Sequence, residues 1–181
     1  DGQLFRASGQ ADKVYGQVVF DVPTIGDDAH LAYEVFVTLF NDQGNDIDAA
    51  YHDYPGSGRL VFEFTEDADV ERARIFKRVM EAIAATEAGL AALITDSKID
   101  LLHKKQTVEE ISLLDSPHYY GMMKAGNVAN VSAAEAITRL DRIDALTAAD
   151  VIGDVGGFLK LPHQYNVFTP EAVAAAQFKQ A

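Results

Sequence analysis

Carboxylates and a histidine that could bind a cation or exchange protons recur in the N-terminal third of the sequence. Four such side chains occupy the polar positions of segments in which polar and apolar residues alternate: Glu34, Asp48, His52 and Glu63. Carboxylate oxygens bind hard cations, and a carboxylate beside an imidazole can act as acid and base. The alternation predicts that they share the outward face of a sheet, which is either a binding site or an ordinary solvated surface.

A second group of carboxylates lies in the loop at residues 41–48. Asp42, Asp46 and Asp48 could bind calcium weakly, because carboxylates are its usual ligands. The loop departs from the EF-hand pattern: Gly44 has the wrong offset, and Asp53 stands where the closing glutamate belongs. A hairpin turn is the simpler interpretation, and we expect no resident cofactor.

The segment at residues 116–121 is the best candidate for a functional loop. It places an imidazole, His118, beside two phenols, Tyr119 and Tyr120, between two expected helices. Loops often carry function, and histidine titrates near neutral pH. We therefore predict a binding role for these three residues, with a packed turn or a subunit contact as the alternatives.

Sequence motifs for metal or nucleotide chemistry are absent from the chain. It contains no cysteine, and its five histidines form neither an H-x-x-x-H nor an H-E-x-x-H pair. There is no Walker A motif, and the glycines at residues 153–157 do not match the dinucleotide-binding pattern. We therefore assign no catalytic residue and no metal ligand from the sequence.

The negative charge of the chain is concentrated in one segment. Residues 21–70 contain twelve acidic residues and one basic residue, Arg59, so they carry −11 of the net charge of −13. Phosphate repulsion opposes nucleic-acid binding through such a segment. The charge is compatible with a basic protein partner or a cation. No apolar run reaches the roughly 18 residues that a membrane span needs.

The elements that position these residues follow from the hydrophobic periodicity. A period of two predicts strands at residues 13–22, 30–40, 46–54 and 59–66, joined as an antiparallel meander. A period of 3.6 predicts a long helix at residues 68–95, and capping residues predict three or four shorter helices at 107–114, 132–146, after Thr147 and at 169–179. The expected fold is α+β: an arm at 1–12 and a single domain at 13–181, β-rich at 13–66 and helical at 67–181.

These features favour a non-enzymatic structural or interaction subunit of a larger assembly, such as a virion or appendage component. The arm and the extended stretch at residues 155–168 would contact neighbouring protein subunits. One alternative is a small-ligand-binding protein or hydrolytic enzyme with a His/carboxylate site. Another is an acidic mimic that binds a basic partner. The chain begins with Asp1, so we expect a processed or trimmed soluble protein, and virion, extracellular and cytoplasmic locations all stay open.

Overall fold

The computed structural model describes residues 2–7, 13–24, 29–44, 46–54, 56–67, 72–113 and 141–170. Its strands are β1 (Gly2–Ala7), β2 (Lys13–Val22), β3 (Ile47–Tyr54), β4 (Ser57–Asp67) and β5 (His163–Pro170). Its helices are α1 (His30–Asn41), α2 (Arg72–Ala88), α3 (Leu90–Leu93), α4 (Asp96–Leu113), α7 (Ala148–Val155) and the short 3-10 helix η1 (Phe158–Lys160). The α+β class predicted from the sequence is therefore confirmed.

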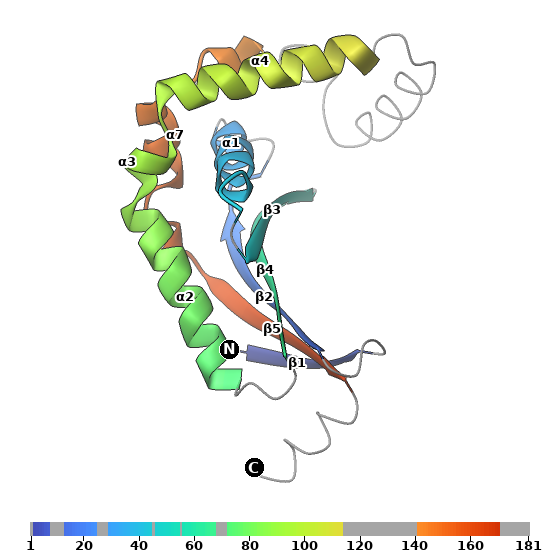
Figure 1. The fold of residues 1–181 in the computed structure, drawn as a ribbon. Coiled ribbons are helices and arrows are strands. Elements are labelled where there is room, and N and C mark those ends of the chain that lie inside the picture. The colour runs from blue at the N-terminus through green and yellow to red at the C-terminus, as the bar shows by residue number, and fades with distance from the viewer. Residues whose placement is uncertain are drawn as a thin grey trace.

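The strands form one five-stranded sheet in the order β1-β5-β2-β4-β3 (Figure 1). Strands β1 and β5 are parallel, whereas β5, β2, β4 and β3 pair antiparallel. Strand β5 comes from the C-terminal part of the chain, yet it lies between β1 and β2. Among the described strands, β3 stands last in this order, so one of its long edges has no described strand beside it.

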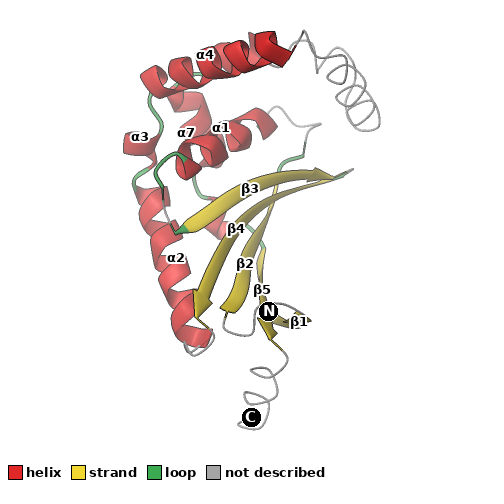
Figure 2. Cartoon of the chain, turned by 45° about the vertical axis from the view of Figure 1, so that its right-hand side comes forward, coloured by secondary structure: helices red, strands yellow, loops and turns green. Residues whose placement is uncertain are grey.

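One face of the sheet carries the hydrophobic core. Alternate residues of β2 and β4, including Val18, Phe20 and Phe62, are fully buried there. Figure 2 shows the described helices α1, α2, α3 and α7 gathered on this side of the sheet. The predicted strands at residues 13–22, 46–54 and 59–66 agree with β2, β3 and β4, because alternation of this kind marks a strand with one buried face.

Residues 30–40 form helix α1, so the strand predicted there is wrong. Eight of its twelve residues are buried, from His30 to Phe40, because the helix packs between the sheet and helix α7. A helix buried on most sides has no polar face, so its period of 3.6 is weak. The β-branched residues Val35 and Val37 favour a strand locally. Tertiary packing overrides this preference, and the segment is helical.

The predicted helical region also differs from the structure in three places. The helix expected at residues 68–95 is interrupted at Gly89, which separates α2 from α3. Helix α4 begins at Asp96, well before the expected start at Thr107. Residues 163–170 are strand β5 rather than part of a connection and a helix, and residues 2–7 of the predicted arm are strand β1. The predicted cap at Thr147 is present as a capping box with Asp150.

None of the helices described in the structure is long and apolar enough to cross a membrane. The helix predicted at residues 132–146 lies mostly outside the described residues, as does that at 169–179 beyond residue 170.

Candidate functional site at the edge of the sheet

Strands β3 and β4 bring two of the predicted binding residues together on the face opposite the core. Asp48 of β3 is directly opposite Glu63 of β4 in the register. His52 is opposite Arg59 instead, and it lies about 13 Å along β3 from Asp48 at the usual rise per residue. Glu34 belongs to helix α1, so its predicted place on the outward sheet face is wrong. The histidine and the three carboxylates therefore do not form one cluster.

Two further side chains surround Glu63, and neither is among the binding residues predicted from the sequence. The Gln17 side-chain amide donates a hydrogen bond of 2.7 Å to Glu63. Tyr15 also hydrogen bonds to Glu63, and burial together with that bond and the Glu63 charge raises the pKa of Tyr15 to about 12. Tyr15 and Gln17 come from β2, which pairs with β4. Polar groups from three adjacent strands thus meet on one face.

The raised pKa of Tyr15 predicts a loss of stability at alkaline pH. The phenol ionises at a higher pH in the folded chain than its ordinary value of 10.0, so its stabilising contribution is present below pH 10 and disappears as the pH rises to about 12. Glu63→Gln removes the carboxylate charge and should lower the pKa of Tyr15. Urea unfolding at a series of pH values, with an NMR titration of the Tyr15 ring, measures both effects.

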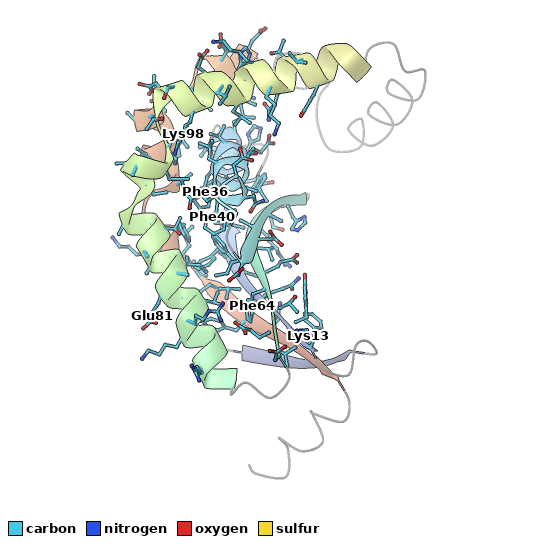
Figure 3. The ribbon with its side chains drawn as sticks, viewed as in Figure 1. Lys13, Phe36, Phe40, Phe64, Glu81 and Lys98 are labelled. Atoms are coloured by element: carbon cyan, nitrogen blue, oxygen red, sulfur yellow. The ribbon has the colours of Figure 1, made fainter. Side chains whose placement is uncertain are left out.

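The matched control for this titration is Glu81→Gln, which makes the same chemical change on the exposed side of α2. Figure 3 shows Glu81 pointing away from the sheet. The substitution Glu81→Gln should therefore leave the pKa of Tyr15 unchanged. A Tyr15 pKa that is the same in Glu63→Gln as in the unaltered protein would contradict the described contact.

A cavity of about 360 Å³ opens beside this cluster, where β3 begins and β4 continues past it. Its lining is mostly polar and acidic: Tyr15, Asp46, Asp48, Glu63, Phe64, Thr65, Glu66 and Arg78. The Arg78 guanidinium from α2 contacts Glu66 at 2.6 Å and Asp46 at 3.7 Å. We call this the acidic cavity.

A second cavity of about 530 Å³ lies on the helical side of the same strand end. Apolar and small side chains make up most of its lining: Phe40, Ile47, Ala82, Ala85, Gly89, Ala92 and Leu93, with Gln43, Thr86, Asp46 and Arg78. Figure 3 shows Phe36, Phe40 and Phe64 on the side of the sheet that faces the helices. We call this the apolar cavity. Asp46 and Arg78 line both cavities, so the two adjoin at the start of β3.

The described residues contain no group of three histidine or acidic side chains that could hold a metal ion. The predicted weak calcium site accordingly does not assemble among them. Asp46 pairs with Arg78, and Asp48 lies on the outer sheet face opposite Glu63. His118, Tyr119 and Tyr120, the predicted binding loop, lie outside the described residues.

No family model and no curated protein matches this chain. Solved structures with the same fold exist. A protease from Helicobacter pylori superimposes with a TM-score of 0.71 at 11% identity, over 93% of this chain and 44% of the protease. The inactive peptidase domain of a putative zinc protease from Bordetella parapertussis gives 0.70 at 11% identity, over 92% of this chain and 96% of that domain.

The ferredoxin protease FusC, solved as a mutant in complex with Arabidopsis ferredoxin, gives a TM-score of 0.54 at 12% identity. The match covers 93% of this chain but 20% of that protein. The hypothesis of a virion or appendage subunit is therefore wrong, because the matching structures named above are proteases and a peptidase domain rather than assembly subunits. Identities this low carry the fold alone, and the fold of this chain is that of domains found in zinc-protease-like proteins.

Proposed function

We propose that this chain is a peptidase-fold domain that binds an extended polypeptide along the edge of strand β3. One observation carries the proposal: the acidic cavity, whose lining includes Asp48 and Glu63 on the outer face of the sheet, adjoins the apolar cavity on the helical side at the start of β3. A polypeptide that adds to a sheet edge as a strand directs successive side chains to opposite faces. Main-chain hydrogen bonds then supply affinity, and pockets for alternate side chains supply specificity.

The linings of the cavities indicate which polypeptide would fit. Asp48 and Glu63 face each other across the strand pair, an arrangement of like charges that is unfavourable until a cation lies between them. A lysine or arginine side chain in the acidic cavity would supply that cation. The apolar cavity, with Phe40, Ile47 and Leu93 in its lining, suits an aliphatic side chain. The preferred polypeptide would alternate basic and apolar residues.

The comparisons support a polypeptide as the ligand. Two of the matching structures are proteases, which act on polypeptides, and one of these was solved in complex with another protein. The residues of this chain do not fit a zinc site of the known helical type. Its sequence has no H-x-x-E-H or H-E-x-x-H motif. The described residues provide no alternative group of three ligands. Binding without zinc-dependent cleavage is accordingly the proposed activity.

The test is a fluorescence anisotropy titration with a short labelled peptide of alternating lysine and leucine. We expect saturable binding that weakens as the salt concentration rises, because the basic side chain pairs with carboxylates. Asp48→Asn and Glu63→Gln should each weaken binding about tenfold, which corresponds to about 1.4 kcal/mol. Glu81→Gln, on the far side of α2, should leave the affinity unchanged.

Two results would contradict the proposal. One is the absence of binding, and the other is equal binding of a peptide in which glutamate replaces lysine. A peptide methylated on alternate backbone nitrogens tests the main-chain pairing directly. This peptide keeps its side chains but loses the backbone N–H donors of one edge. It should bind more weakly than the unmethylated peptide when the methylated edge is the one that faces β3.

A second candidate function, metal-dependent hydrolysis, is favoured by one feature of helix α1. His30 and Glu34 are four residues apart, so they lie on the same side of the helix at the spacing common to paired metal ligands, but the described residues supply no third ligand beside them. His30 is 5% exposed. The same peptide, incubated with the protein and zinc, decides between the two functions. An intact peptide supports binding alone, and cleavage that His30→Ala abolishes supports hydrolysis.

A further inference from the structure

The side chain of Asn41 hydrogen bonds to both backbone groups of a single residue in strand β3. Its amide nitrogen donates to the Ala49 carbonyl oxygen at 2.8 Å. Its amide oxygen accepts from the Ala49 backbone N–H, also at 2.8 Å. Asn41 is the last residue of helix α1 and is itself exposed, whereas Ala49 is buried. The end of α1 is therefore hydrogen bonded to β3 near the start of the strand.

The direction of these bonds places Asn41 at the outer edge of the sheet. In an antiparallel strand, the N–H and C=O of one residue point to the same side, and neighbouring residues point to opposite sides. Because Ala49 bonds to Asn41, its backbone groups point away from β4, as do those of Ile47 and Tyr51. The Asn41 amide, which uses one of its two N–H donors and its oxygen acceptor here, thus takes the place that a peptide group of a further strand would occupy.

We propose that Asn41 is a built-in competitor for the polypeptide, and that it sets where a strand can pair with β3. Ala49 lies between the outward-facing positions Ile47 and Tyr51, so a guest strand cannot pair continuously from Ile47 to Tyr51 while the Asn41 side chain is bonded there. Continuous pairing requires that side chain to rotate away. This inference rests on the proposed function, whose site it shares.

The exchange is feasible because it conserves hydrogen bonds. When the Asn41 side chain rotates away, Ala49 loses one hydrogen-bond donor and one acceptor. A guest strand would supply both again, so neither backbone group of the buried Ala49 is left unsatisfied. The released amide side chain belongs to an exposed residue and can hydrogen bond to water. Sheet edges are commonly protected against unwanted pairing, and a side-chain amide bonded to both edge groups of one residue is such protection in this chain.

The experiment compares the affinity of the unaltered protein and of Asn41→Ala for the labelled lysine–leucine peptide. Removing the competitor should strengthen binding about tenfold, since two hydrogen bonds no longer have to be displaced. Thr38→Ala is the matched control. Thr38 is in the same last turns of α1, but its hydroxyl donates to the Glu34 carbonyl and not to β3. It should leave the affinity unchanged.

A second measurement follows Asn41 itself in the unaltered protein. Bound peptide should shift the NMR signals of its side-chain amide protons to those of a solvent-exposed amide. The amide proton of Ala49 should exchange faster in Asn41→Ala than in the unaltered protein, and peptide should slow it again. Circular dichroism establishes that the variant is folded, so that a change in affinity is not caused by unfolding.

The outcomes separate this inference from the proposed function. If the unaltered protein binds the peptide and folded Asn41→Ala binds it no better, or if the Asn41 signals do not move on binding, the competitor role is overturned and the binding function stands. If neither protein binds any peptide, the proposed function fails and the inference with it. Stronger binding by Asn41→Ala, with Thr38→Ala unchanged, supports both.

Discussion

Replacing Phe62 by alanine should lower the free energy of unfolding by about 3–5 kcal/mol, the usual cost of removing a buried phenylalanine. The Phe62 ring is completely buried in the core face of β4. Its centroid lies 6.0 Å from that of Phe20, 6.4 Å from Phe36, 5.4 Å from Phe40 and 5.8 Å from Phe158. These rings come from β2, α1 and η1, so the cavity would open where β4 meets three other elements. Urea denaturation followed by circular dichroism measures the loss.

The comparison for Phe62 is Leu101→Ala on helix α4. Leu101 is 68% exposed, so its truncation should change the free energy of unfolding by no more than about 0.5 kcal/mol. Phe62→Leu, which keeps most of the apolar volume, should fall between the two. A loss below about 1 kcal/mol for Phe62→Ala would mean that the aromatic cluster does not hold the sheet to the helices as described.

Local alternation was enough to predict three of the strands. In β2, Val14, Val18 and Phe20 occupy alternating positions and are buried, while Tyr15 and Gln17 between them face outward. A strand with one buried face carries this pattern in its own residues. The same signal could have identified Tyr15 and Gln17 as neighbours of the predicted site, because they occupy the polar positions of that strand.

The rest of the fold depends on contacts between distant segments. Helix α1 is covered on most sides by segments that are distant in the sequence, so most of its residues are apolar. It therefore lacks the polar face by which a surface helix is recognised. Strand β5 is inserted between β1 and β2, although β2 ends at Val22 and β5 begins only at His163. No local pattern encodes which strand lies beside which.

The candidate site was predictable in part for the same reason. The alternation placed Asp48 and Glu63 on one face, and the strand register then made them direct neighbours. The position of Arg78, which contacts Glu66 and Asp46, depends on how α2 packs beside the sheet. The sequence places Asn41 in the loop at residues 41–48, for which a hairpin turn is the simpler interpretation. Its bonds to Ala49 require the helix that the periodicity did not reveal.

Replacing Gly58 by alanine should also destabilise the fold, by about 3 kcal/mol, the upper end of the usual cost of overpacking. A Cβ atom at Gly58 would lie 2.0 Å from the Pro23 carbonyl oxygen and 2.8 Å from that of Val22. Both obstacles are backbone, so no side-chain rotation relieves the contact. The Pro23 oxygen also accepts a hydrogen bond of 2.9 Å from the Tyr51 hydroxyl of β3, which a shift of the backbone would break. Thermal and urea unfolding measure the effect.

The same substitution at Gly153 supplies the control, with the opposite sign. Gly153 lies within helix α7, and nothing stands within 4 Å of the position that its Cβ would take. Alanine is the better helix former, so Gly153→Ala should raise the free energy of unfolding by about 0.5–1 kcal/mol. If the two variants changed stability equally, the close approach of β4 to the Pro23 backbone would be refuted. A loss of stability in Gly58→Ala together with a gain in Gly153→Ala would show that the effect at Gly58 comes from the contact with the Pro23 and Val22 backbone. It would not come from the loss of a glycine as such.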